Sequence, residues 1–366
     1  MTEAYIKLGE IATYINGYAF KPKDRGREGL PIIRIQDLTG NSNDKGFYKG
    51  KYPSKIEINN GDILISWSAS LGVYIWNSGR ALLNQHIFKV VFDKKAIDRD
   101  YFVYAVQFSL NKMKQLTHGA TMKHVVKKDF ENVSIPYPSL TEQRKIACIL
   151  DKLKKSMSKR LQELKKLDEL IKARFVEMFG NPEQNEKSWK TCRLGDECRV
   201  INGRAYKAEE LLDEGKYRVL RVGNFFTNDS WYYSDLELDE DKYCEDGDLL
   251  FAWSASFGPR IWRGEKVIYH YHIWKLIGYE SCFNKDFLVE LLNYNCDVMK
   301  RGTHGSTMLH FTKSQMEEQK LILPPMELQN QFTDFVHQVN KSKVVVQKAL
   351  DEAHLLFDSL MQEYFE

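Results

Sequence analysis

The sequence lacks long apolar runs. No stretch of 18 apolar residues occurs, and the start Met1-Thr2-Glu3-Ala4-Tyr5 has no basic segment followed by an apolar one. A membrane-spanning helix needs about 20 apolar residues, and a secretory leader needs both segments, so we expect neither a membrane span nor export. The expected location is the cytoplasm.

The six cysteines form no C-x-x-C pair, which argues against a zinc site or a disulfide framework and for cysteines that pack in a core. The common catalytic motifs are also missing: neither a P-loop, a dinucleotide-binding glycine motif, H-E-x-x-H nor G-x-S-x-G occurs. We therefore expect a protein that binds rather than catalyses, with no metal site.

What the sequence does contain is an internal repeat. Gly17 lies in Ile15-Asn16-Gly17 and Gly203 in Ile201-Asn202-Gly203, 186 residues later. The same offset relates the Trp-Ser-Ala-Ser segments at Trp67 and Trp253, and the Thr-His-Gly segments at His118 and His304. Two similar units joined by a short link indicate one task performed at two places.

The repeat predicts an α+β protein with internal pseudo-twofold symmetry, in which two similar mixed α/β domains are separated by two long helices. The predicted segments are a first recognition domain at 1–138, a central helical spacer at 139–180, a linker at 181–186, a second recognition domain at 187–325 and a C-terminal helical spacer at 326–366. Within the first domain we expect short strands at 32–35 and 63–65 and a helix at 100–116, capped by Asp100.

Both spacers carry a seven-residue apolar repeat, which is typical of paired helices. The first has rows Leu150, Met157, Leu164, Ile171, Met178 and Ile146, Leu153, Leu167, interrupted by Arg160 and Arg174; the second has Val336, Leu350, Phe357, Tyr364 and Phe332, Val339, Val346, Ala353, Leu360, interrupted by Lys343. Residues 139–179 hold 11 Lys/Arg and 6 Asp/Glu, whereas 326–366 hold 3 and 7. These opposite charges favour pairing of the two spacers. We expect an antiparallel coiled coil because a compact domain lies between the two helices in the chain, and the internal duplication favours this pairing over dimerisation with another chain.

Several polar residues recur in both units and suit contact with a polyanion. They are Lys21, Lys207, Arg34, Arg221, His118, His304, Thr121 and Thr307. Three histidine pairs, His86/His272, His118/His304 and His124/His310, are the recurring residues most typical of enzymes. Phosphate contact or structural hydrogen bonding explains them better than catalysis, although a hydrolase that uses His86/His272 or His118/His304 stays open at this point.

The tandem units, the segment Ile15-Asn16-Gly17-Tyr18-Ala19-Phe20, the Ile135-Pro136-Tyr137-Pro138 ending and the following Leu140-Thr141-Glu142-Gln143-Arg144 resemble the specificity subunit of type I restriction-modification systems. The second copy, Pro324-Pro325-Met326-Glu327-Leu328-Gln329, keeps the glutamine but loses the basic residues after it. The resemblance covers the whole chain.

This resemblance implies a non-catalytic subunit that binds double-stranded DNA and recognises an asymmetric, bipartite target. It implies two methyltransferase (M) subunits docked on the helices, which methylate adenine at N6, and restriction (R) subunits that cleave. S-adenosylmethionine, ATP and Mg would lie on those partners, and none in this chain. The alternative is a coiled-coil adaptor between proteins that recognises no DNA sequence.

The internal repeat also divides the candidate residues. Shared positions, listed above, are expected to contact phosphates or support the scaffold, so that Arg34→Ala would weaken binding to all DNA. Positions that differ between the units can make the two half-sites differ. The base-contact candidates are Tyr18, Gln36, Asp37, Tyr74, Gln85, Lys123, Arg204, Asn224, Arg260 and Tyr271.

Overall fold

The computed structural model describes residues 4–41, 44–68, 70–116, 126–226, 229–254, 257–302 and 312–366. The chain divides into two compact units, Met1–Leu161 with Lys348–Glu366, and Gln162–Gln347. Among the described residues, no helix combines the length and the apolar character needed to cross a bilayer.

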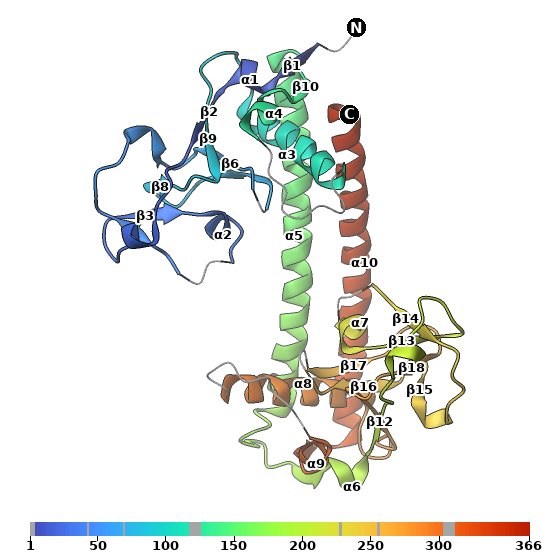
Figure 1. The fold of residues 1–366 in the computed structure, drawn as a ribbon. Helices are drawn as coiled ribbons and strands as arrows, with labels where there is room; N and C mark the ends of the chain where they lie inside the picture. Colours follow the sequence, from blue (N-terminus) through green and yellow to red (C-terminus); the bar gives the residue numbers. More distant parts are fainter. Residues whose placement is uncertain are drawn as a thin grey trace. The chain divides into compact units, whose positions relative to one another are not determined.

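The first unit contains a small pairing of β1 with β10 and two four-stranded sheets (Figure 1). One sheet is antiparallel in the order β2-β9-β6-β7, and the other runs β4-β3-β8-β5 with β3 and β8 parallel. The strands are β1 (Tyr5–Lys7), β2 (Thr13–Asn16), β3 (Leu30–Ile33), β4 (Phe47–Tyr48), β5 (Glu57–Ile58), β6 (Ile63–Ser66), β7 (Gly72–Ile75), β8 (Ala81–Leu83), β9 (Ile87–Val91) and β10 (Ser134–Pro136). The helices are α1 (Leu8–Ile11), η1 (Pro22–Asp24), α2 (Ile35–Leu38), η2 (Ser54–Ile56), α3 (Arg99–Leu116) and α4 (Lys127–Glu131).

The second unit repeats this plan: β11 pairs with β20, and the sheets run β12-β19-β16-β17 and β14-β13-β18-β15. The strands are β11 (Lys190–Arg193), β12 (Arg199–Asn202), β13 (Tyr217–Leu220), β14 (Tyr232–Ser234), β15 (Tyr243–Cys244), β16 (Leu249–Ala252), β17 (Gly258–Ile261), β18 (Val267–Tyr269), β19 (Ile273–Ile277) and β20 (Lys320–Leu323). The helices are α6 (Leu194–Glu197), η3 (Ala208–Glu210), α7 (Val222–Phe226), η4 (Glu240–Lys242), α8 (Lys285–Gly302) and α9 (Lys313–Glu317). The two units therefore have the same topology.

The sheet of β2, β9, β6 and β7 and helix α3 share the main core of the first unit, in which Phe88 and Phe102 are almost completely buried. The predicted cap of α3 is wrong by two residues, because Asp98 Oδ1 accepts from the amides of Asp100 and Tyr101 at 3.2 and 3.1 Å. The predicted strand at 32–35 ends earlier, at Ile33, since α2 begins at Ile35.

A buried glutamine ties each recognition region to the long helix that follows it. The Gln143 side chain accepts from the Asp98 amide at 2.8 Å and donates to the Pro138 carbonyl at 2.9 Å. Gln329 accepts from the Asn284 amide at 2.8 Å and donates to the Pro324 carbonyl at 2.9 Å. Both side chains are at most 1% exposed, so this tie explains why the glutamine persists in the second copy while its basic neighbours do not.

The two long helices are α5 (Leu140–Phe179) and α10 (Met326–Phe365), and each contributes one part to each unit. In the second unit, Asp168 pairs with Lys343 at 2.6 Å and the Phe179 ring lies 5.7 Å from that of Phe332. Along these two contacts the residue numbers rise in α5 and fall in α10, so the helices run antiparallel there.

In the first unit, Ile146 and Leu150 near the start of α5 share a core with Met361 and Phe365 near the end of α10. The heptad positions expected from the sequence are buried or half-buried along both helices. The predicted fold class is confirmed, whereas the residue boundaries of the recognition domains, spacers and linker stay predictions.

Candidate nucleic-acid interface

The glycine that begins each repeat lies against the backbone of a neighbouring strand end. A Cβ on Gly17 would lie 2.1 Å from the Asn84 carbonyl oxygen, and one on Gly203 would lie 2.4 Å from that of His270. Only glycine fits such a close approach of two backbone segments. In both units, the glycine therefore sets the backbone position of the residue that follows it.

The residues that follow these glycines differ between the units, although their backbones are bonded alike. The Tyr18 amide donates to the Leu83 carbonyl at 2.8 Å, and the Arg204 amide donates to the Tyr269 carbonyl at 3.0 Å. Tyr18 forms a bridge with Asn84, beside Gln85. The candidate pairs Tyr18/Gln85 and Arg204/Tyr271 are therefore each brought together by the fold.

In the second unit, Arg204 is held in place by an acidic partner. Its Nη1 and Nη2 atoms donate to the two carboxylate oxygens of Glu210 at 2.8 and 2.7 Å, and its guanidinium lies 5.2 Å from the Tyr206 ring. The hydrogen bond from Arg204, followed by that from the Lys207 amide, lowers the pKa of Glu210 to about 2. The result is an oriented cation on a partly exposed surface.

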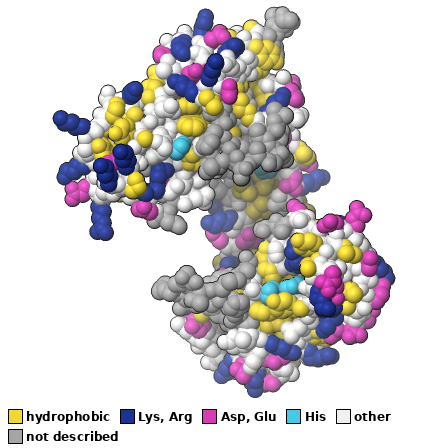
Figure 2. All heavy atoms as spheres, in the orientation of Figure 1, with side chains coloured by type: hydrophobic (Ala, Val, Ile, Leu, Met, Phe, Trp, Pro, Cys, Tyr) yellow, Lys and Arg dark blue, Asp and Glu magenta, His cyan; other side chains and the backbone are white. Residues whose placement is uncertain are grey.

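An aromatic and imidazole cluster adjoins Arg204. Tyr271 is 38% exposed, and its ring lies 4.0 Å from that of His272 and 4.4 Å from that of His270. Figure 2 shows histidine side chains beside hydrophobic ones on this unit. Burial, then the charges of His272 and Arg221, lower the pKa of His270 to about 4, so its ring offers hydrogen bonding rather than charge at neutral pH.

The first unit has a different surface at the equivalent place. Tyr18 is 43% exposed and meets Phe20 edge to face at 5.0 Å, and Phe20 meets Tyr48 at 5.1 Å. The Gln85 side chain lies 3.0 Å from His86 Nε2. Exposed aromatic rings and amides can stack on and hydrogen-bond to nucleotides.

The Arg34 side chain is held by partners within its own unit. Its side chain is 18% exposed, its Nε lies 3.4 Å from Asp37 Oδ2, and its Nη2 donates to the Asp44 carbonyl. Asp37 is only 6% exposed and also accepts from the Arg34 amide at 2.8 Å. Both residues hold the α2 segment together, which favours the scaffold role for Arg34 over the phosphate contact and argues against base contact by Asp37.

The equivalent segment of the second unit is organised differently. The Arg221 guanidinium lies 4.1 Å from the centre of the Tyr232 ring, a favourable cation–π contact. The Asn224 side-chain amide donates to the Ser230 carbonyl at 2.7 Å. These candidates thus have structural partners within the unit.

The two shared lysines lie at the start of short 3₁₀ helices. The Lys21 amide donates to Asp24 at 2.8 Å, and the Lys207 amide donates to Glu210 at 2.9 Å. Their side chains are exposed, with that of Lys207 75% exposed. A fixed backbone below an exposed ammonium group is compatible with the expected phosphate contact.

Tyr74 and Arg260 occupy equivalent strands, β7 and β17. Tyr74 is half-buried against the core of its unit, whereas Arg260 is exposed with its guanidinium 4.8 Å from the Phe226 ring. Arg260 is therefore the more accessible of the two. The candidates His118, Thr121, Lys123, His304 and Thr307 lie outside the described residues, so their roles stay predictions.

Sequence reasoning missed several residues that organise these surfaces. Asn84 and His270 differ between the units at equivalent positions, a difference that the repeat alignment contained. Glu210 and Tyr232, by contrast, become partners of Arg204 and Arg221 only through the fold.

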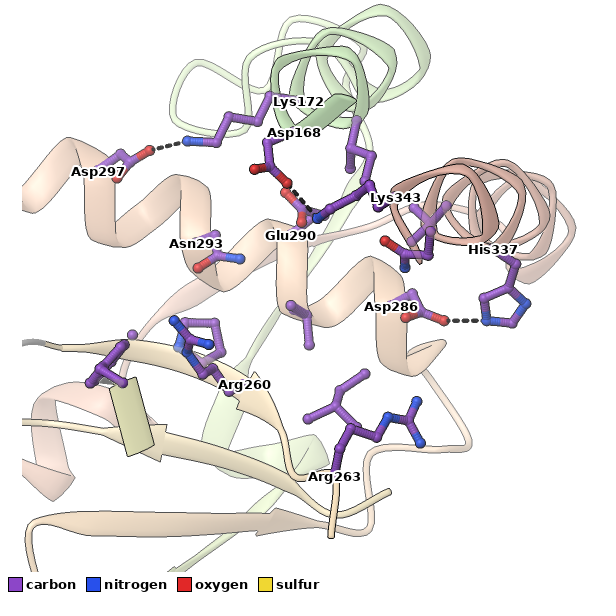
Figure 3. A pocket seen from close by; sticks show the side chains of 18 of the residues that line it. Asp168, Lys172, Arg260, Arg263, Asp286, Glu290, Asn293, Asp297, His337 and Lys343 are labelled. Atoms are coloured by element: carbon purple, nitrogen blue, oxygen red, sulfur yellow. Dashed lines mark hydrogen bonds and ion pairs between the residues drawn. The ribbon is translucent and has the colours of Figure 1, made fainter. Parts of the chain in front are cut away.

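A polar cavity of about 690 Å³ lies within the second unit, between α5, α8, α10 and β17 (Figure 3). Lys172 pairs with Asp297 at 3.0 Å and Lys343 with Asp168 at 2.6 Å, on either side of Glu290. Burial raises the pKa of Glu290 to about 7, the carboxylate of Asp168 adds to the rise, and Lys172 and Lys343 oppose it.

The residue equivalent to Glu290 in the first unit is Tyr104, whose hydroxyl donates to Asp151 at 2.7 Å. Lys154 lies 4.7 Å from the Tyr104 ring. Both arrangements join a helix of the recognition region to the long helices, so we assign the cavity to packing rather than to DNA contact.

Comparison with known proteins gives a consistent result. The chain is 28% identical over 170 residues to the EcoBI specificity subunit of Escherichia coli, a match that covers 46% of this chain and 35% of that protein. It is 25% identical over 383 residues to the MjaVIII specificity subunit of Methanocaldococcus jannaschii, covering 94% and 89% of the two chains. Both relatives are type I restriction enzyme subunits.

The fold is similar to that of the type I restriction-modification S subunit from M. genitalium, with a TM-score of 0.56 at 16% identity over 100% of this chain and 97% of that one. A chain from a structure of type I restriction-modification complex assembly gives a TM-score of 0.61 at 17% identity, covering 99% and 97%. Residues 3–166 and 186–352 both match the type I restriction modification DNA specificity domain. The chain therefore belongs to the type I restriction-modification DNA specificity family, and it carries two specificity domains in one polypeptide, as a specificity subunit does.

Proposed function

We propose that each unit recognises one half of an asymmetric, bipartite target in double-stranded DNA. The observation that carries this proposal is a shared backbone with unlike exposed side chains. The residues after Gly17 and Gly203 have corresponding backbone hydrogen bonds, but the residue is Tyr18 beside Gln85 in one unit and Arg204 beside Tyr271 in the other. One scaffold with two sets of side chains is suited to two different half-sites.

In this proposal the exposed Lys21 and Lys207 contact phosphates, and Tyr18, Gln36, Gln85, Arg204, Arg260 and Tyr271 supply the base contacts. Arg34, Asp37, Arg221 and Asn224 position the segments that carry them. This division follows from exposure and from the hydrogen bonds described above.

The partners in this proposal are two adenine-N6 methyltransferase subunits on the long helices, together with restriction subunits. The partners would bind S-adenosylmethionine, ATP and Mg, while this chain, in the cytoplasm, would select the DNA without catalysing a reaction. Exposed apolar residues on the helices support docking there: Leu170 and Leu356, at equivalent repeat positions, are 47% and 50% exposed. An adaptor without DNA recognition is not favoured, because the matched domain is a DNA specificity domain.

Co-expression of the full chain with its methyltransferase subunit, followed by mapping of methyladenine in genomic DNA, tests the proposal. We expect one asymmetric sequence with two defined parts and an undefined spacer. Exchange of residues 1–138 for the equivalent region of another specificity subunit should change one part only. A change in both parts, or methylation without sequence preference, would contradict the proposal.

A further inference from the structure

The guanidinium of Arg34 is engaged on several sides. Beyond Asp37 and the Asp44 carbonyl, its Nη1 and Nη2 atoms both lie 3.0 Å from the side-chain oxygen of Gln36. The Gln36 amide is assigned with its oxygen toward Arg34 because the opposite orientation would set its N–H groups against those of the guanidinium. Arg34 thus fixes the orientation of a neighbouring amide.

This contact changes what Gln36 can offer. An amide oxygen accepts up to two hydrogen bonds, and two N–H donors of Arg34 converge on that of Gln36. The side chain of Gln36 is exposed on α2. Its NH₂ group, with two donors and no acceptor, is therefore the part left for a ligand.

A glutamine normally recognises adenine with both ends of its amide, since the oxygen accepts from N6 and the nitrogen donates to N7. An amide whose oxygen is already occupied cannot make the first of these bonds. Guanine presents two adjacent acceptors in the major groove, O6 and N7, and so matches a group that only donates.

We propose that Gln36 recognises a guanine in the half-site of the first unit and that Arg34 sets this preference by occupying the Gln36 oxygen. The inference rests on the proposed function, since it requires the first unit to contact DNA. It applies to one half-site only, because Gly223 at the equivalent position of the second unit has no side chain. Arg34 is a positioning residue, and Gln36 is the specificity-determining one.

The test replaces Gln36 in the full chain, co-expressed with its methyltransferase subunit, and maps methyladenine. Gln36→Glu is the sharpest variant. The carboxylate keeps one oxygen on Arg34 and offers the other as an acceptor, which matches the N4 amino group of cytosine. Gln36→Ala removes the side chain altogether, and Gln184→Ala, at an exposed linker glutamine, is the matched control.

We expect one position of one half-site to be guanine in the wild-type target. Gln36→Ala should relax that position by about 10-fold, and Gln36→Glu should shift it toward cytosine. The other half-site and the Gln184→Ala target should not change. An adenine whose selection depends on Gln36, or a target unaffected by both Gln36 variants, would overturn the inference.

Arg34→Lys provides a second readout. Lysine keeps the positive charge but lacks the paired N–H donors of the guanidinium that contact the Gln36 oxygen. Release of the Gln36 oxygen should allow adenine at the same position. A thermal unfolding curve of the purified complex should accompany this variant to establish that it is folded. If wild-type methylation shows no sequence preference at all, the proposed function itself fails. If the wild type methylates a defined sequence and the Gln36 variants methylate the same one, only this inference fails.

Discussion

The amide of Tyr271 donates to the carbonyl of Arg204 at 3.0 Å, so two residues 67 positions apart in the sequence share one edge of the second unit. Arg204 is in turn fixed by the carboxylate of Glu210. An oriented guanidinium therefore lies beside an exposed tyrosine in the second unit, and the first unit has Tyr18 and Gln85 at the equivalent place.

Arg204→Ala should therefore relax one position in the second half-site and leave the first half-site unchanged. Loss of a base contact by an arginine typically costs ~1–3 kcal/mol of discrimination. Binding of the methyltransferase complex to duplexes with single substitutions measures this. Arg199→Ala, at an exposed position of β12, is the control, and an equal loss on random duplexes would show that Arg204 contacts phosphate instead.

Gly17→Ala should destabilise the first unit, because its Cβ would meet the Asn84 carbonyl at 2.1 Å. We expect a loss of ~1–3 kcal/mol in the free energy of unfolding. Gly26→Ala is the matched control, since its nearest atom would be 3.7 Å away. Urea unfolding monitored by circular dichroism compares the two, and similar midpoints would contradict the steric argument.

Gln143→Ala should cost ~1–3 kcal/mol of stability, since it leaves the Asp98 amide and the Pro138 carbonyl without their buried partner. Gln162→Ala removes an exposed glutamine from the same helix and should have little effect. Hydrogen exchange at the start of α3 gives a local measurement. Unchanged protection there in Gln143→Ala would show that the tie does not hold the helix.

The pKa of Glu290, raised to about 7 by burial, predicts a pH-dependent contribution to the stability of the second unit. The ordinary value is 4.5, so between these two values the folded state binds more protons than the unfolded state. This group therefore makes the unit less stable as pH rises to 7, with no further change above it.

Glu290→Gln removes the titrating group, so the stability of this variant relative to the wild type should increase between about pH 5 and about pH 8. Glu209→Gln, at a carboxylate 74% exposed, is the matched control. Urea midpoints at both pH values measure the difference. Parallel pH profiles for wild type and Glu290→Gln would exclude this role.

Leu170→Glu and Leu356→Glu should each weaken capture of a methyltransferase subunit by about 10-fold, because an exposed apolar contact typically contributes on the order of 1–2 kcal/mol when it is buried at an interface. Gln162→Glu, at an exposed position of α5, adds the same negative charge and is the control. Co-purification with the tagged chain measures binding. Full capture by both leucine variants would place the docking surface elsewhere.

The sequence predicted the architecture well because the repeat and the heptads are patterns of spacing. Leu150 and Phe332 are buried where the heptads place them, since helical periodicity decides which face is covered. The cap at Asp98 was missed because either Asp98 or Asp100 satisfies the preference for aspartate at a helix start.

The candidate site was less predictable. The repeat showed that Arg34 and Arg221 recur, but it could not show that Arg34 holds Gln36 while Arg221 lies on Tyr232. Such partners come from separate segments or from the orientation of side chains, which the spacing of residues does not determine. The difference between Tyr18 and Arg204 could be predicted, because the constant offset of the repeat aligns the two units position by position.

The glutamine ties have a consequence for how genes of this kind can change. Gln143 bonds to Asp98 and Pro138, and Gln329 bonds to Asn284 and Pro324, so both ends of each tie are encoded within one repeat. A genetic crossover in the linker codons for residues 181–186 would pass each tie on intact. Under the proposed function, such recombination would exchange one recognition region together with the joint that holds it, and one half of the target would change in a single event.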